Sequence, residues 1–322
     1  MKTRNLCFDQ LKGILIILVI VGHVVVGSID KSLVRSLIYF FHMPLFLAVT
    51  GYFISTTLLA LPIKDIIKKY QNRLIVPFLL AYVVYYILLG HHQPLTANIK
   101  NMLSLYPYYH LWYVPAVLLF IVYLKFFYYL YQRRLNVIIY FLAVLCLLTT
   151  LYFETYVQWH LSNHWLYQAL GDKRFYYFFA YFACGFLLSN HKNKLPFYSK
   201  YALLGLFVAL FVCHYTKVDY VAGAAKVIAN FALIVWVLYL CQYQKICTVP
   251  LLVKIGEVSL PIYLWHILLL LLLQKLPVGV GIYYLLSLLV FVLFVVLVIY
   301  FDNKNAIINR LFYGKVGTKH AT

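Results

Sequence analysis

The chain has 322 residues, of which 65% are hydrophobic and only 11% are charged, and its formal net charge is +19 at pH 7. This composition lies far outside the range of soluble globular domains and is typical of an integral membrane protein. The positive charge implies no nucleic acid partner, because basic loops beside a membrane ordinarily meet anionic lipid headgroups.

About ten apolar runs along the chain are long enough to cross a bilayer. They are 11–29, 36–60, 74–91, 111–131, 135–153, 175–190, 200–216, 223–243, 256–274 and 280–301. We therefore expect an all-α, polytopic integral membrane protein with about ten transmembrane helices, located in the plasma membrane. It is expected to form one domain over residues 1–322, with neither a cleaved signal peptide nor an appended soluble domain. About 19 of the 27 Lys and Arg residues fall on the side of the N-terminus, which places both termini in the cytoplasm.

The first run carries three ionisable residues, Asp9, Lys12 and His23. Eleven residues of an α-helix return to within about 20° of the starting direction, so Lys12 and His23 share one face, and Asp9 lies near it. Ionisable groups inside a membrane are energetically expensive, and each therefore indicates a functional site.

The second run contains His42 and Pro44. This helix enters from the outer side, so His42 lies at a depth similar to that of His23. Pro44 lacks a backbone donor and frees a carbonyl about one turn earlier, a local break that favours a cavity. The alternative role for each histidine is a hydrogen bond between helices.

Four basic residues, Lys64, Lys68, Lys69 and Arg73, precede the third run. The lysines are typical of membrane anchoring on the inner side. Arg73 abuts the membrane and can hold a phosphate or carboxylate through a bidentate fork.

Aromatic residues dominate the two long segments predicted outside, 92–110 and 154–174. They indicate either an interfacial belt or a surface that stacks on sugar rings, and Trp112 at the start of the fourth run is an ordinary interfacial residue. The six cysteines lack zinc or redox spacing, and no metal site is expected.

The ninth run contains Glu257, Ser259, Pro261, Tyr263 and His266. Glu257 lies near the cytoplasmic end and His266 near mid-membrane. Nine residues turn a helix by about 180°, so the two side chains face opposite ways on a straight helix unless Pro261 kinks it.

Five motifs in this order resemble the acyltransferase 3 family, and the subgroup that they most resemble is that of the fucose 4-O-acetylase-like proteins. The motifs are Asp9-Gln10-Leu11-Lys12-Gly13 with Gly22-His23, Phe41-His42-Met43-Pro44-Leu45-Phe46 with Gly51-Tyr52, Arg73-Leu74-Ile75-Val76-Pro77, Leu111-Trp112-Tyr113, and Ser259 to His266. Many members of the family carry Arg at the position of Lys12, and Lys cannot form the bidentate fork.

The resemblance implies a membrane O-acyltransferase that moves an acyl group, usually acetyl, from acyl-CoA to a hydroxyl of a cell-envelope or exopolysaccharide sugar. Acyl-CoA is then a substrate rather than a bound cofactor, and the partners are the acyl-CoA, the sugar or polysaccharide and membrane lipids. Such transfer needs a base for the hydroxyl proton and positive charge for the donor. The expected catalytic residues are His23, Lys12 and His42, and the expected binding residues are Asp9, Arg73, Trp112, Glu257, Ser259, Tyr263 and His266.

Two alternatives remain open. A transporter or flippase of lipid-linked glycans would use the histidines as a proton relay and would carry charges along several helices, whereas the middle runs hold few charges apart from Lys226. A polysaccharide export factor would use the same fold for binding without catalysis.

Overall fold

The computed structural model describes residues 5–28, 31–89, 110–130, 174–216 and 219–315, together with positions 94, 96 and 148. Every regular element within these ranges is a helix, which confirms the predicted all-α fold class. The predicted run 135–153 and the aromatic segments 92–110 and 154–174 lie almost entirely outside the described residues.

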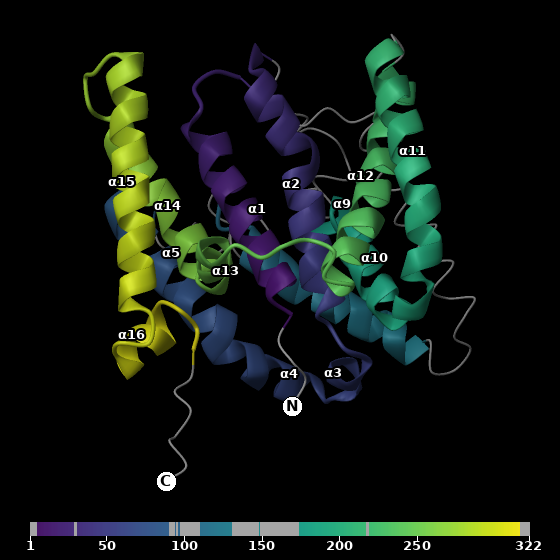
Figure 1. Ribbon diagram of the computed structural model, residues 1–322. Helices are drawn as coiled ribbons and strands as arrows, with labels where there is room; N and C mark the ends of the chain where they lie inside the picture. Colours follow the sequence, from purple (N-terminus) through teal and green to yellow (C-terminus); the bar gives the residue numbers. More distant parts are fainter. Residues whose placement is uncertain are drawn as a thin grey trace.

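Figure 1 labels the helices in chain order. They are α1 (Leu6–Val24), α2 (Leu33–Tyr52), α3 (Thr56–Ala60), α4 (Ile63–Tyr70), α5 (Val76–Leu89), α9 (Arg174–Tyr177), α10 (Phe179–Asn190), α11 (Leu195–Tyr215), α12 (Asp219–Gln242), α13 (Pro250–Glu257), α14 (Ser259–Gln274), α15 (Val280–Phe301) and α16 (Ala306–Leu311). A π-helical segment, Gln71–Ile75, joins α4 to α5, and a further helix covers Tyr113–Leu130.

Seven of the described helices are long and apolar enough to cross a membrane. They are Leu6–Val24, Leu33–Tyr52, Ile63–Leu88, Tyr113–Leu130, Lys192–Tyr215, Val221–Gln242 and Val280–Phe301. The pair Pro250–Glu257 and Ser259–Gln274, bent by 79°, makes an eighth if the two cross together. The protein is therefore a multi-pass helical membrane protein, while the total of ten spans and the side on which the termini lie stay predictions.

Besides the run 256–274, which is divided between α13 and α14, two predicted runs differ from the observed helices. The run 36–60 is interrupted after Tyr52, because Ser55 caps the separate helix α3, its Oγ accepting a hydrogen bond from the Leu58 amide (3.1 Å). The run 175–190 is divided between α9 and α10, and α10 has only 12 residues. Twelve helical residues cover about 18 Å, less than the hydrocarbon core of a bilayer.

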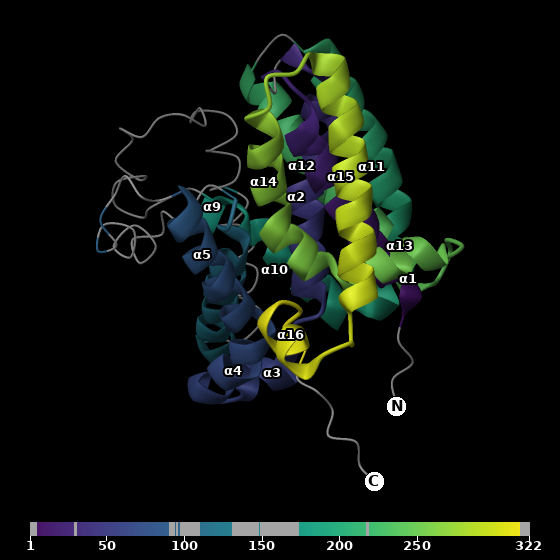
Figure 2. The ribbon, with the colours of Figure 1, turned by 90° about the vertical axis from the view of Figure 1, so that its left-hand side faces the viewer.

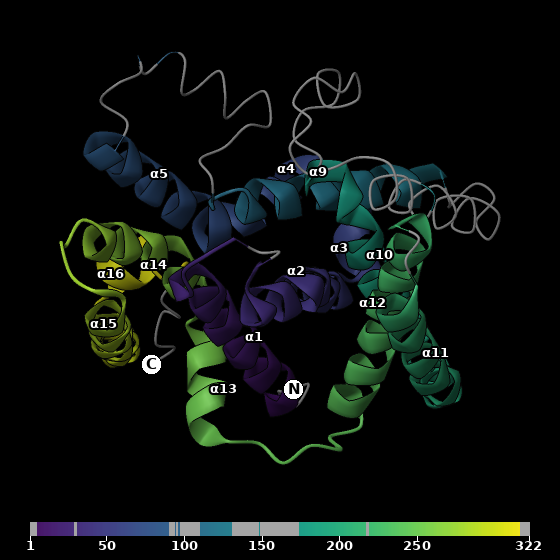
Figure 3. The same cartoon turned by 90° about the horizontal axis from the view of Figure 1, so that it is seen from above.

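The helices α1 and α2 lie in the middle of the bundle when it is seen from above, with α14 and α15 on one side and α11 and α12 on the other (Figure 3). Figure 2 shows α3, α4 and α16 together at one end of the molecule, which we call the lower end. The connection between α14 and α15 marks the opposite, upper end. Large apolar side chains on α11 and α15, such as Phe207 and Leu288, are exposed and therefore face lipid.

Glycines allow pairs of helices to meet through their main chains. A Cβ atom on Gly256 would lie 1.7 Å from the Asp9 carbonyl oxygen, and one on Gly13 would lie 2.1 Å from the Leu252 carbonyl oxygen, so α1 and α13 touch directly. Small residues are frequent at such interfaces because lipid gives no hydrophobic drive for helix association. This contact brings the start of α1 close to the end of α13.

The carbonyl that Pro44 leaves without its helical partner is that of Phe40, one turn earlier. Asn230, which is buried on α12, donates its side-chain amide to this Phe40 oxygen at 3.1 Å. The same amide also donates to the Lys226 carbonyl at 2.9 Å. The predicted break at Pro44 is thus closed by a neighbouring helix, and α2 continues to Tyr52.

Replacing Asn230 by Leu is expected to destabilise the protein by about 1–3 kcal/mol, because the Phe40 carbonyl would stay buried without a donor. In a Pro44→Ala background, Asn230→Leu is expected to lower the free energy of unfolding by a smaller amount, because the backbone amide of the alanine can donate to the Phe40 carbonyl. Thermal unfolding of the four proteins in detergent measures this coupling. Equal losses in both backgrounds would contradict the assignment of Asn230 to that carbonyl.

Candidate active site

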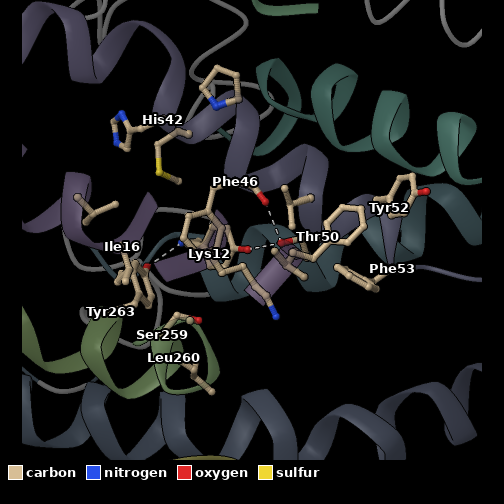
Figure 4. Close-up of a pocket in the computed structure, with 18 of the residues that line it drawn as sticks. Lys12, Ile16, His42, Phe46, Thr50, Tyr52, Phe53, Ser259, Leu260 and Tyr263 are labelled. Carbon is tan, nitrogen blue, oxygen red and sulfur yellow. Dashed lines mark hydrogen bonds between the residues drawn. The ribbon is translucent and has the colours of Figure 1, made fainter. Parts of the chain in front are cut away.

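One cavity of about 2250 Å³ runs through the described part of the bundle, and all ten residues expected at the site line it. They come from five separate parts of the chain: Asp9, Lys12, His23, His42, Arg73, Trp112, Glu257, Ser259, Tyr263 and His266. Figure 4 shows Lys12, Thr50, Ser259 and Tyr263 around the same space. On α1, Lys12, Ile16, Val19 and His23 all face the cavity, as the helical spacing predicts.

Ion pairs gather at the lower end of the cavity. Lys12 Nζ lies 2.6 Å from Asp9 Oδ1, and the ammonium also stacks over the Phe53 ring, 5.6 Å from its centroid. Glu257, at the end of α13, pairs with Lys254 at 3.2 Å. The main-chain contact of α1 with α13 therefore places two carboxylates and the Lys12 ammonium at one mouth of the cavity.

Arg73 lies in the π-helical segment Gln71–Ile75 and lines the same mouth. Single turns of π-helix are rare and occur often at functional sites. The segment after α15 packs against this turn, and Arg310 Nε donates to Asn72 Oδ1 at 3.0 Å. Within that segment, Lys315 pairs with Asp302 at 2.6 Å. Tyr313 donates to the Val298 carbonyl at 2.6 Å, and burial together with nearby Asp302 raises its pKa to about 12.

Gly314 is required where this segment crosses Arg73. Its φ of +62° favours glycine, and a Cβ there would lie 2.1 Å from the Arg73 carbonyl oxygen. Gly314→Ala is expected to detach the segment, which would raise the rate at which trypsin cleaves after Arg310. Gly279→Ala, where nothing lies within 4 Å, is the control. Equal cleavage rates in the two variants and the wild type would show that the contact is dispensable.

Four histidines converge in the upper half of the cavity: His23, His42, His110 and His266. The rings of His23 and His266 lie 5.4 Å apart, and those of His110 and His266 lie 5.9 Å apart. The Tyr39 ring lies between His23 and His42, with centroid distances of 6.2 and 5.0 Å, and its hydroxyl is 3.4 Å from His23 Nδ1. Helices α1, α2 and α14 thus bring separate histidines to one place.

Backbone carbonyls determine the tautomers of two of these histidines. His42 Nδ1 lies 2.6 Å from the Ile38 carbonyl oxygen, and His266 Nδ1 lies 2.8 Å from that of Tyr263. A carbonyl only accepts, so Nδ1 carries the proton and Nε2 is left as the basic nitrogen. The Nε2 atoms of His266 and His110 are buried and have no hydrogen-bond partner among the described residues. A buried imidazole nitrogen without a partner can accept a hydrogen bond from a substrate.

The placement of Glu257 and His266 differs from the expectation for a straight helix. The chain bends by 79° at Val258, between α13 and α14, and both side chains line the cavity. Pro261 is not the site of this bend, because it lies in the first turn of α14, where the amide it lacks would have no helical partner. Because of this bend, one predicted run supplies Glu257 to the lower end of the cavity and His266 to its upper half.

Polar contacts connect the fourth and ninth runs. Tyr113 donates its amide to the Tyr263 hydroxyl at 3.1 Å, and that hydroxyl donates to the His110 carbonyl. The Tyr113 hydroxyl lies 2.5 Å from Thr50 Oγ1. These bonds fix the orientation of Tyr263, which lines the cavity and is drawn in Figure 4.

Sequence reasoning missed several cavity residues, namely Arg35, Tyr39, His110, Arg174 and Lys226. His110 directly precedes Leu111-Trp112-Tyr113, and a fourth histidine beside a predicted span was a signal that could have been used. Arg174 stacks over the Trp112 ring at 5.3 Å, a partner that the sequence does not indicate. Among the described residues no group of three or more potential metal ligands is present.

Comparison with known families decides the class of this protein. The family profile of an acyltransferase domain matches residues 5–301, from just before α1 to the end of α15. The chain belongs to the acyltransferase 3 family. The acyltransferase 3 match covers every helix that lines the cavity, and it confirms the resemblance carried by the five motifs. The protein is therefore a multi-pass membrane protein of this family.

Two curated relatives align with part of this acyltransferase 3 protein. The nodulation protein NolL of Sinorhizobium fredii (strain NBRC 101917 / NGR234) is 39% identical over 85 residues, which is 24% of this chain and 23% of the relative. The nodulation protein NolL of Mesorhizobium japonicum (strain LMG 29417 / CECT 9101 / MAFF 303099) aligns with the same identity and coverage. The alignment thus spans about a quarter of each relative. No solved structure matches the chain.

Proposed function

We propose that the protein is an O-acyltransferase of the plasma membrane. It transfers an acyl group, most simply acetyl, from acyl-CoA to a hydroxyl of a cell-envelope or exopolysaccharide sugar. The observation that carries this proposal is the large cavity, which has Lys12, Arg73 and Lys315 at its lower end and four histidines in its upper half. Cations suit the phosphates of coenzyme A, and imidazoles suit the proton transfer.

The spacing of Lys12 and His23 along α1 fits this division of roles. Lys12 and His23 are separated by about 16 Å along α1, at 1.5 Å per residue, a distance comparable to an extended pantetheine arm. Acyl-CoA bound at the lower end can therefore present its thioester to the histidines. The positive-inside distribution of Lys and Arg favours the cytoplasm for that lower end, and acyl-CoA is made in the cytoplasm.

During the transfer, the proton of the sugar hydroxyl moves first to His23 and then to the departing thiolate of coenzyme A. The sugar hydroxyl oxygen attacks the thioester carbonyl carbon while His23 takes the hydroxyl proton as general base. The carbon–oxygen bond forms, the carbon–sulfur bond breaks, and the thiolate of coenzyme A leaves with that proton. Hydrogen-bond donors near the thioester oxygen stabilise the developing oxyanion, while Lys12, about 16 Å away on the same helix face, provides positive charge for the phosphates of the donor.

The alternative is a glycan transporter or export factor with the same fold. Its support is that Arg35, Arg174 and Lys226 line the cavity, so charges are spread over more helices than the sequence indicated. Such a protein would move glycan without consuming acyl-CoA.

Quantification of ester-linked acyl groups tests the proposal. Surface polysaccharides are purified from a gene-deleted host and from the same host complemented with wild type, and proton NMR is recorded before and after mild alkali. We expect an alkali-labile ester signal that is lost on deletion and restored by the wild-type gene. Unchanged esters with an altered amount or location of glycan would instead favour the transport function.

A further inference from the structure

A second, smaller cavity of about 460 Å³ adjoins the first at the upper end of the molecule. Its wall is formed by the end of α1, the start of α2, Tyr85 of α5, and the last part of α14 from Ile267 to Gln274. Three residues line both cavities: His23, Arg35 and His110. The histidine that we assign as general base therefore stands where the two cavities adjoin.

The charged side chain at this junction is Arg35, in the first turn of α2. Its guanidinium donates to the Gly27 carbonyl and stacks over the Tyr39 ring at 5.6 Å, which fixes the group in place. The Arg35 Nε atom is buried and has no hydrogen-bond partner among the described residues. A guanidinium carries five donors, so this contact leaves most of them for a ligand.

The surroundings of Arg35 favour a negatively charged ligand. No carboxylate of the described residues lines the second cavity, and Arg35 is the basic residue that it shares with the first cavity. His110 is 5% exposed, and its Nε2 is buried without a partner in the part of the chain that the structure describes, so the second cavity is lined by a possible hydrogen-bond acceptor as well as by the guanidinium. A ligand that carries both an anionic group and a hydroxyl would satisfy both residues.

We infer that the second cavity is the entry and binding site of the acceptor, and that the acceptor is a sugar bearing a carboxylate or phosphate. Arg35 holds the anionic group, and His110 accepts a hydrogen bond from a hydroxyl of the same sugar. A neighbouring hydroxyl then faces His23 and the thioester delivered through the first cavity. This inference rests on the proposed function and specifies its acceptor.

Binding measured without turnover tests this inference. The full chain is placed in phosphatidylcholine nanodiscs and titrated with glucuronate, glucose 6-phosphate and glucose by calorimetry. Wild type is expected to bind the two anionic sugars at least about tenfold more tightly than glucose. In Arg35→Gln the ratio is expected to fall toward one, and Arg35→Lys, which keeps the charge without the fork, is expected to give an intermediate ratio.

Lys275→Gln is the matched control. Lys275 is an exposed cation that lines neither cavity, and it directly follows Gln274, which lines the second cavity. It is expected to keep the wild-type ratio. A wild type that does not distinguish anionic sugars from glucose, or an Arg35→Gln variant that still does, would overturn the inference. Binding abolished when phosphatidylglycerol is added to the discs would assign the site to a lipid headgroup and overturn it as well.

Turnover of the same samples separates the two proposals. Acetyl-CoA is added together with each sugar, and free thiol and sugar ester are measured. If anionic sugars bind preferentially but no sugar ester forms, the proposed function is wrong and the anion site is still supported. Ester formation with equal KM values for anionic and neutral sugars would uphold the proposed function and overturn the anion site.

Discussion

Replacement of His23 by Gln is expected to lower the rate of acyl transfer by at least about 100-fold, a typical contribution of a general base. Glutamine fills the space of the imidazole and keeps a hydrogen-bonding group near Tyr39, but it cannot take a proton from a sugar hydroxyl. Thiol release from acetyl-CoA in the presence of acceptor measures the rate, and immunoblotting of membranes verifies that the amount of protein is unchanged.

His214 supplies the matched control, because it also lies in the last turn of a membrane helix, α11, but does not line either cavity. His214→Gln is expected to retain wild-type activity. If His23→Gln kept its activity, the base would have to be another member of the cluster, and the assignment of His23 would be wrong.

Among the proposed substitutions, Gly256→Ala is expected to lower the free energy of unfolding most, because it adds a methyl group where α1 and α13 touch. Its carbon would lie 1.7 Å from the Asp9 carbonyl oxygen and 3.0 Å from the Gly13 amide nitrogen, both of which are rigid backbone atoms of α1. The helices α1 and α13 would have to separate, so Gly256→Ala is expected to cost about 3 kcal/mol or more, at the upper end of overpacking effects.

Thermal unfolding in detergent measures this loss. Gly205→Ala is the control, because Gly205 also lies within a helix but has nothing within 4 Å of the added carbon. That variant is expected to be neutral or more stable by up to about 1 kcal/mol, since Ala favours helix. If both variants unfolded at the wild-type temperature, the close crossing of α1 and α13 would be contradicted.

Periodicity within a single helix was the most informative part of the sequence. The spacing of Lys12 and His23 on α1 indicates one face, and both line the cavity. The missing amide of Pro44 indicates a free carbonyl one turn earlier, and Asn230 bonds to it. Both inferences rest on local geometry, which the sequence determines directly.

Features that depend on contacts between distant segments could not be predicted in this way. The π-helical turn at Arg73 is held against Gly314, which is 241 residues later in the chain. The bend between Glu257 and His266 lies at Val258 rather than at Pro261, because a proline in a first helical turn removes no bond. Hydropathy likewise does not separate α2 from α3, since the break follows from the Ser55 cap rather than from a loss of apolar residues.

The two adjoining cavities also bear on how this protein keeps the membrane sealed. An aqueous path through a bundle of helices would dissipate the ion gradients of the cell if small cations could follow it. Among the described residues, the two cavities are lined by two acidic side chains, Asp9 and Glu257, and by seven basic ones: Lys12, Arg35, Arg73, Arg174, Lys192, Lys226 and Lys315. Fixed positive charge repels cations from a pore. The basic groups that we assign to anionic substrates are therefore also expected to repel sodium ions and protons from the two cavities, which would limit ion leakage while substrates enter.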